Sequence, residues 1–169
     1  MEKARRKTQP TPKVPGKADE RVRDLMKTEV ITTSPNTTAR DAWRIMEKNR
    51  IRHLPVVIDD RLVGMLSERE LYLYLTTFAI YGSGKAAPAP ATPAAPEDLV
   101  NIRIETIMAR DPYSVGPAHT LEEAARLMAF HRLSAVPVVE DDRRLVGILT
   151  TQDILTHLSE AFHPEPRED

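Results

Sequence analysis

The sequence contains no cysteine in its 169 residues, which excludes disulfides, thiol nucleophiles and cysteine-ligated metal ions. Its formal net charge is only −1, so the overall charge does not favour nucleic acid or a membrane surface as a partner. No apolar run approaches the ~18 residues that span a bilayer. No apolar segment follows the charged N-terminus, as one would in a secretory signal. These absences favour a cytoplasmic protein with no membrane partner.

Sequence motifs of the common catalytic sites are absent as well. There is no Walker loop, no GxGxxG and no GxSxG, and the five histidines do not have the spacing of a zinc site. The acidic pairs Asp59–Asp60 and Asp141–Asp142 are typical of turns rather than of acid–base catalysis. We therefore expect no enzymatic activity, no required cofactor and no metal site.

The sequence does contain an internal repeat with two copies. Residues 24–58 match residues 106–140 without a gap, with Met26 on Met108, an offset of 82 residues. One residue is then added near Arg144. The match resumes with Leu62-Val63-Gly64 on Leu145-Val146-Gly147. A repeat predicts a pseudo-symmetric molecule with two related surfaces. Each copy is marginal in size alone, so we expect the two copies to share a core.

The composition divides the chain into five segments. Residues 1–19 form a basic, proline-containing tail that is too poor in apolar residues to order itself. The two copies occupy residues 20–80 and 99–162, and the Pro/Ala-rich residues 81–98 form a semi-extended linker between them. The last residues, 163–169, are predicted to fray. A basic tail can contact nucleic acid, but we expect a solvated tail and no nucleic-acid partner.

The local patterns predict the order βαββα in each copy. A short helix over 21–27 leads into a β-rich segment, Val30–Thr33. The capping boxes Thr38-x-x-Asp41 and Thr120-x-x-Glu123 each begin a helix of about ten residues. A hairpin and a second helix then follow in each copy. Their predicted ranges are 54–58, 62–66 and 67–78 in the first copy, and 136–139, 145–149 and 151–162 in the second. The fold class is therefore α/β (α+β), with helices packed on a small sheet in each copy.

Three motifs, present in both copies in the same order, resemble the cystathionine-β-synthase (CBS) domain. They are residues 24–26, 54–57 and 64–71 in the first copy, and 106–108, 136–139 and 147–154 in the second. The pair resembles the tandem arrangement called a Bateman module, over about 21–80 and 101–162.

The resemblance implies two repeats packed sheet to sheet around a pseudo-twofold axis, with two clefts between them. In that family the clefts hold adenosine compounds such as AMP, ADP, ATP or S-adenosylmethionine. The modules regulate attached or partner proteins and usually dimerise into a flat disk. The resemblance therefore implies a homodimer and a protein target of unknown identity.

The resemblance also assigns the ribose contact to a hydroxyl residue at a strand-to-helix junction and a carboxylate three residues later. In the second copy these are Thr150 and Asp153, and in the first copy Ser67 and Glu70. A carboxylate on the first helical turn, where backbone N–H groups are free, can accept hydrogen bonds from both ribose hydroxyls. The extra methylene of Glu70 predicts that the two clefts differ in affinity. The alternative is purely structural: Thr150 is an N-cap and Asp153 a favourable first-turn acid.

Phosphate and adenine contacts follow from the same resemblance. Arg52 and His53 match positions that contact phosphate in the regulatory subunits of AMP-activated protein kinase. The second copy has Ser134 and Ala135 there, with Arg132 before them, so the first copy is predicted to favour phosphate. A histidine in this place predicts pH-dependent affinity near neutrality. The expected adenine pocket, whose members can each equally be core residues, comprises Ile31, Ile51, Met65, Tyr113, Leu133 and Ile148.

The leading hypothesis is a regulatory module that binds an adenosine compound between the repeats and signals to a partner. The alternative is a dimerisation or scaffold module with degenerate, ligand-free clefts. A third reading is a DNA-associated regulator that uses the basic tail.

Overall fold

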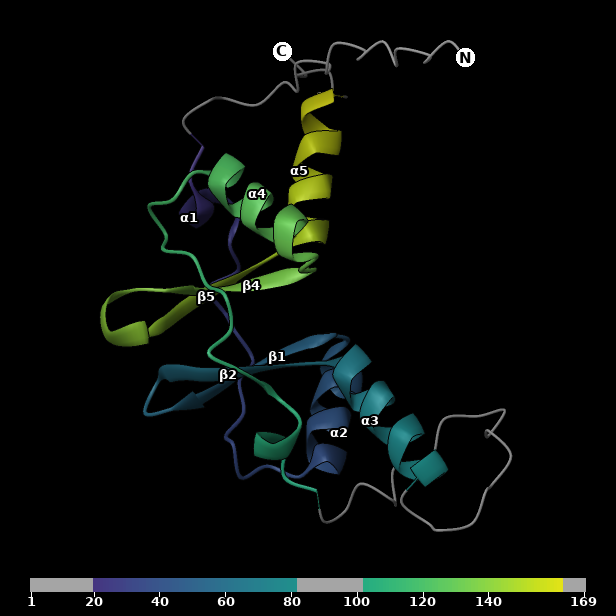
Figure 1. Cartoon of the computed structure of the whole chain (residues 1–169). Helices are drawn as coiled ribbons and strands as arrows, with labels where there is room; N and C mark the ends of the chain where they lie inside the picture. The colour runs from purple at the N-terminus through teal and green to yellow at the C-terminus, as the bar shows by residue number, and fades with distance from the viewer. Residues whose placement is uncertain (1–19, 82–101, 163–169) are drawn as a thin grey trace, which may run out of the picture.

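The computed structural model describes residues 20–81 and 102–162. The predicted tails and nearly all of the predicted linker lie outside these residues. Two halves are stacked with their β-hairpins facing each other at the centre, and two helices cover the outer side of each hairpin (Figure 1). The α/β class predicted from the sequence is confirmed. No helix in the described ranges is long and apolar enough to cross a membrane.

Each half is built around a hairpin and two helices, close to the predicted ranges. The first half consists of α2 (Ala39–Asn49), β1 (His53–Ile58), β2 (Arg61–Ser67) and α3 (Glu68–Tyr81). The second consists of α4 (Leu121–His131), β4 (Ala135–Val139), the 3-10 turn η3 (Asp141–Arg143), β5 (Leu145–Thr150) and α5 (Thr151–Phe162). Short lead segments precede them, namely α1 (Val22–Leu25), the 3-10 turn η2 (Ile104–Thr106) and β3 (Ala109–Arg110).

The predicted strand Val30–Thr33 is not formed. Only Thr33 pairs with β1, in parallel, where its N–H donates to the Pro55 carbonyl at 3.0 Å. Upstream, the N–H of Val30 bonds to the carbonyl of Thr28 instead. This local turn keeps the preceding residues from running along β1, so the β-rich composition of the segment is not expressed as a strand. The helix predicted over 21–27 is likewise shorter and ends at Leu25.

The two predicted capping boxes differ in how fully they form. At α4, Thr120 Oγ1 accepts the Glu123 N–H at 3.1 Å, and the Glu123 carboxylate accepts the Thr120 N–H at 2.8 Å. At α2, Thr38 Oγ1 accepts the Asp41 N–H at 3.1 Å, and the Asp41 carboxylate accepts the Thr38 hydroxyl, as Glu123 accepts that of Thr120, but it does not accept the Thr38 N–H. Its other oxygen lies 3.7 Å from Arg44 Nη1. The second half of the predicted box at Thr38 is therefore wrong.

The lead segments cross over between the copies. Val22 is fully buried in the core of the second half, and its N–H donates to the His119 carbonyl at 2.9 Å. Ile104, the residue that matches Val22 in the repeat, is fully buried in the core of the first half and donates to the Thr37 carbonyl at 3.0 Å. Each core is thus completed by the other copy. Burying such a side chain contributes about 1.5–3 kcal/mol, so neither copy has its whole core without the other.

The crossing segments also extend the small sheets. Lys27 and Ile148 exchange two backbone hydrogen bonds, at 2.9 and 3.0 Å. In the first half β3 pairs with β2, with Ala109 opposite Met65. Lys27 and Ala109 occupy the same position of the repeat. Lys27 pairs with the hairpin of the second half, and Ala109 pairs with the hairpin of the first half.

The hairpins hold the halves together at the centre of the molecule. The Leu145 N–H donates to the Asp60 carbonyl at 2.9 Å, and Arg61 Nη2 lies 3.2 Å from Asp142 Oδ2. Asp59 and Asp60, predicted as a turn, both adopt positive φ, 48° and 61°, a conformation that aspartate tolerates well. The hairpin turns therefore serve as inter-repeat contacts as well as connections.

Candidate functional site

Asp153 lies on the first turn of α5, immediately after β5, and its side chain is only 11% exposed. Its Oδ2 accepts the Thr150 N–H at 2.9 Å and the Thr150 hydroxyl at 2.6 Å, while Thr150 Oγ1 accepts the Asp153 N–H at 3.2 Å. This is a complete N-terminal capping box. The two residues predicted to contact ribose are therefore together, in the arrangement that the structural alternative requires.

The other oxygen of Asp153 has a partner that the sequence reasoning missed. Lys27 Nζ lies 2.9 Å from Asp153 Oδ1, brought there by the crossing segment that pairs with β5. Partial burial of the carboxyl opposes ionisation, but the hydrogen bonds from Thr150 and the charge of Lys27 outweigh it and lower the pKa of Asp153 below its usual 3.8. Asp153 is therefore a carboxylate at neutral pH with both oxygens engaged.

Glu70 occupies the same place in the first half. Its Oε2 accepts the Ser67 N–H at 2.7 Å and the Ser67 hydroxyl at 3.0 Å, and Ser67 Oγ accepts the Glu70 N–H at 3.2 Å. The longer side chain thus forms the same cap as Asp153. The visible difference between the two sites is the residue that pairs with the second hairpin strand, which is Lys27 beside Asp153 and Ala109 in the first half.

The predicted phosphate-binding residues differ in their surroundings. His53 Nε2 lies 2.7 Å from Ser134 Oγ, across the contact between the halves. Burial of its ring, and then the nearby charge of Arg52, lower the pKa of His53 below 6.5. Arg52 is exposed. Arg132 is exposed and forms the left-handed C-cap of α4, with φ 55°. Of the three, only His53 lies at the junction between the copies, and there it faces Ser134.

The six residues proposed for adenine are distributed over different environments. Tyr113, 52% exposed, stacks on the His131 ring with centroids 3.8 Å apart. Ile31 is 37% exposed and Met65 only 8%. The remaining three are half-buried, Ile51 against the first core, Leu133 against the second, and Ile148 on β5. Met65 thus belongs to the core, and Tyr113 packs against the last residue of α4.

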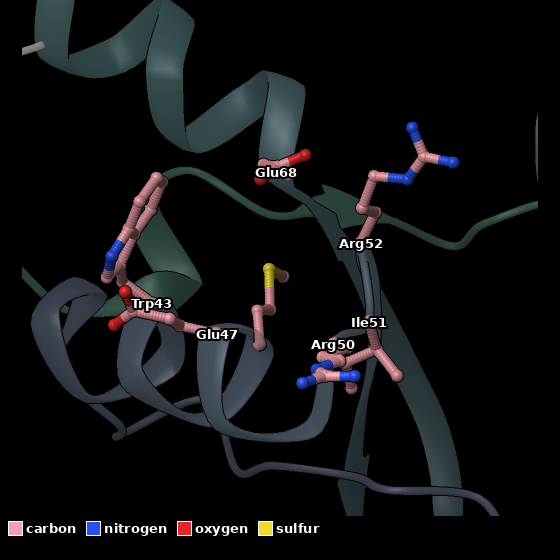
Figure 2. A pocket seen from close by; sticks show the side chains of 7 residues that line it. Trp43, Glu47, Arg50, Ile51, Arg52 and Glu68 are labelled. Carbon is pink, nitrogen blue, oxygen red and sulfur yellow. The ribbon is translucent and has the colours of Figure 1, made fainter.

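A pocket of about 340 Å³ lies on the helical side of the first half. Figure 2 shows Trp43 on one side of it, Arg50 and Ile51 on the other, and Glu68 at the start of α3. Its full lining is Trp43, Met46, Glu47, Arg50, Ile51, Arg52 and Glu68. The Trp43 ring meets that of Tyr72 edge-on, with centroids 5.0 Å apart. Two predicted site residues, Ile51 and Arg52, thus line a pocket between α2 and α3 that includes none of the capping carboxylates.

Nowhere in residues 20–81 or 102–162 do three His, Asp or Glu side chains gather in a group that could hold a metal ion.

These features define a class, namely a tandem of pseudo-symmetric repeats, each a β-hairpin covered by two helices, with one capping carboxylate at each hairpin-to-helix junction. Residues 22–76 and 104–160 match the family model of the CBS domain, and the chain belongs to this family as a tandem pair. It is 32% identical over 133 residues to the CBS domain-containing protein YhcV of Bacillus subtilis, a match that covers 79% of this chain and 81% of YhcV.

Solved CBS-domain structures share the fold. The CBS domain pair of protein MJ0100, in complex with 5′-methylthioadenosine and S-adenosyl-L-methionine, superposes with a TM-score of 0.63 at 27% identity, covering 82% of this chain and 95% of the other. CBSX2 in complex with AMP gives a TM-score of 0.65 at 25% identity, covering 83% and 97%. The predicted resemblance is therefore confirmed.

Other relatives are longer than this chain. It spans 27% of the inosine-5′-monophosphate dehydrogenase of Korarchaeum cryptofilum at 30% identity, and 48% of protein MJ1225 of Methanocaldococcus jannaschii at 31% identity. The chain therefore matches only part of the length of these relatives.

Proposed function

We propose that this chain is a regulatory module that binds an adenosine compound between its two repeats and signals the binding to a partner protein. The observation that carries the proposal is Asp153, a largely buried carboxylate fixed on the first turn of α5 in a fold whose relatives hold AMP, 5′-methylthioadenosine and S-adenosylmethionine. A carboxylate held at a helix N-terminus can accept both ribose hydroxyls, because capping occupies only part of its acceptor capacity.

The proposed contacts follow the predicted residues where the structure allows them. Asp153 and Thr150 take the ribose in one cleft, and Glu70 and Ser67 in the other. Arg52 and Arg132, both exposed, are free to turn toward phosphate, whereas His53 would first have to leave Ser134. Ile31, Ile51, Tyr113, Leu133 and Ile148 supply apolar surface, and Met65 supports it from the core.

Signalling requires that the ligand favour one arrangement of the repeats over another. Ligand binding can shift such an equilibrium only by its difference in affinity for the two arrangements, typically about 1–3 kcal/mol. The inter-repeat contacts at Asp60–Leu145 and His53–Ser134 are the bonds that a rearrangement would change. A homodimer is part of the proposal. It is supported by large apolar side chains exposed on α4 and α5, Phe130 at 84% and Leu155 at 61%.

The test is a thermal-shift panel on the full chain with AMP, ADP, ATP, 5′-methylthioadenosine and S-adenosylmethionine. A ligand at 100 times its dissociation constant adds about 2.7 kcal/mol to the free energy of unfolding, which raises the melting temperature by several degrees. The matched control is Asp153→Asn, in which the shift should fall. A panel with no shift for any compound would contradict the proposal.

The complete capping boxes at Asp153 and Glu70 favour a second candidate, a scaffold whose clefts bind nothing, since both carboxylates already have structural roles. A scaffold predicts a dimer by light scattering together with no shift in the panel. A ligand-binding module predicts the shift.

A further inference from the structure

The ion pair between Lys27 and Asp153 is the feature of the second site that has no counterpart in the first. The carboxylate uses Oδ2 for the cap, where it accepts both the N–H and the hydroxyl of Thr150, and Oδ1 for Lys27 Nζ at 2.9 Å. The cap cannot be given up without exposing the first turn of α5. A ribose that approaches Asp153 must therefore take Oδ1, the oxygen that Lys27 holds.

The position of Lys27 is set by the backbone. Its N–H and carbonyl pair with Ile148 on β5, two residues before Thr150, the first residue of the cap, and five before Asp153. Its side chain, in contrast, is 64% exposed. The ammonium can therefore swing away from Asp153 while the backbone stays in register. A lysine displaced in this way remains at the edge of the same site.

The repeat provides an internal comparison. Ala109 pairs with Met65 as Lys27 pairs with Ile148, and it brings no charge toward Glu70. The Asp153 site therefore carries a compensating cation that the Glu70 site lacks at the equivalent position.

We propose that Lys27 makes the Asp153 site selective for anionic adenosine ligands, nucleotides with a 5′-phosphate, over uncharged nucleosides. This inference rests on the proposed function. A ribose that displaces Lys27 from Oδ1 breaks an ion pair. A 5′-phosphate on the same ligand gives the ammonium a new anionic partner, whereas a neutral 5′-group does not. Lys27 thus competes with the ribose of every ligand for Oδ1. Only a ligand with a negatively charged 5′-group regains an ion pair with the displaced ammonium.

The experiment measures binding of two ligands that differ at the 5′-position, AMP and 5′-methylthioadenosine, by calorimetry on the full chain at fixed ionic strength. In Lys27→Met, which keeps the aliphatic stem, AMP should bind about tenfold more weakly because a charge-assisted hydrogen bond is lost. 5′-Methylthioadenosine should bind up to about fivefold more tightly, because an exposed competing ion pair is gone. The opposite signs separate a ligand-contacting lysine from one that only supports the fold.

Three further variants complete the test. Lys27→Arg keeps the charge and should retain the preference for AMP, and Lys48→Met, at an exposed lysine on α2, should change neither affinity. Ala109→Lys places the cation opposite Glu70 and should raise the preference of that site for AMP. All effects of Lys27→Met should disappear in the Asp153→Asn background.

The outcomes distinguish this inference from the proposed function. If the wild type binds neither ligand nor any other compound of the panel, both are overturned. If the wild type binds and Lys27→Met changes both affinities by the same factor, or changes neither, only the role of Lys27 is overturned.

Discussion

At the scale of single residues, Asp153 has two roles whose demands differ. As a cap it needs one oxygen toward Thr150, and as a ligand site it needs the other oxygen to be exchangeable. Asp153 Oδ1 can exchange its partner because that partner, Lys27, is mostly exposed, and an exposed ion pair is weak. Glu70 shows that the cap itself tolerates an extra methylene, since Glu70 forms the same three hydrogen bonds with Ser67 that Asp153 forms with Thr150. The methylene predicted from the sequence to separate the two sites therefore matters less than the residue opposite.

The lowered pKa of Asp153 predicts a pH-dependent contribution to stability. Because the folded-state pKa is below the usual 3.8, ionised Asp153 stabilises the fold above that pH, and the contribution is lost as pH falls through the folded-state pKa. Asp153→Asn should thus lower the free energy of unfolding by about 1 kcal/mol at pH 7, with a smaller difference toward pH 3.5. Urea denaturation at both pH values measures it. An equal loss at both would show that the charge has no part in the cap.

His53 predicts a second pH dependence, nearer neutrality. Burial lowers its pKa below 6.5, so the fold favours the neutral ring. Its contribution to stability is therefore complete above pH 6.5 and declines as pH falls from there through the folded-state pKa. Wild type should lose stability between pH 7.5 and 5.5 relative to His53→Gln, measured by thermal unfolding. Ligand affinity should change over the same range, and a flat binding profile from pH 5.5 to 8 would remove His53 from the site.

At the scale of secondary-structure elements, two glycines permit the crossing segments to lie against the hairpins. A Cβ on Gly147 would lie 2.7 Å from Met26 Sδ and 3.1 Å from the Lys27 carbonyl. Gly64 meets Met108 and the Ala109 carbonyl in the equivalent way. The glycine of each second hairpin strand is thus explained by the backbone that passes over it from the other copy.

Gly147→Ala should therefore destabilise the protein by about 1–3 kcal/mol through overpacking. Met26→Ala should relieve part of this, so that the double variant is more stable than the sum of the two single effects predicts. Gly116→Ala is the control, because its added methyl would meet the exposed His119 ring, which can move. Urea midpoints of the four variants provide the measurement. Strict additivity of the changes at positions 26 and 147 would show that the two residues do not touch.

The elements divide clearly into those that local sequence predicts and those that it does not. Hairpins and helices follow from alternation, capping residues and turn acids, all of which act within a few residues of one another. Val22 and Ile104 occupy the same position of the repeat, so the sequence alone cannot decide whether each packs into its own copy or the other. Lys27 was missed for the same reason, since its partner Asp153 lies across that crossing. The strand predicted over Val30–Thr33 does not form, because residues with strand propensity form a strand only where they can pair with a neighbouring strand. Only Thr33 pairs with one, β1.

At the scale of the whole molecule, the reciprocal packing makes the two repeats one folding unit. The first copy contributes Val22 to the second core, and the second copy contributes Ile104 to the first. Each also adds backbone hydrogen bonds to the other, as Lys27 does with Ile148. A ligand that moves one hairpin therefore acts on segments that belong to both copies, which is the coupling that the proposed regulation needs.

This unity predicts that the two copies stay together when the chain is cut between them. With a protease site placed between residues 86 and 96, the cleaved protein should elute as one species and unfold in a single transition, because neither fragment holds a complete core. The matched control adds Val22→Asp and Ile104→Asp, which place charges in both cores at a cost of several kcal/mol and should separate the fragments after cleavage. Size-exclusion chromatography with mass detection distinguishes the two results. Fragments of the otherwise unchanged chain that separate and remain folded would show that each copy completes its own core, and the position of Lys27 beside Asp153 would then have no structural basis.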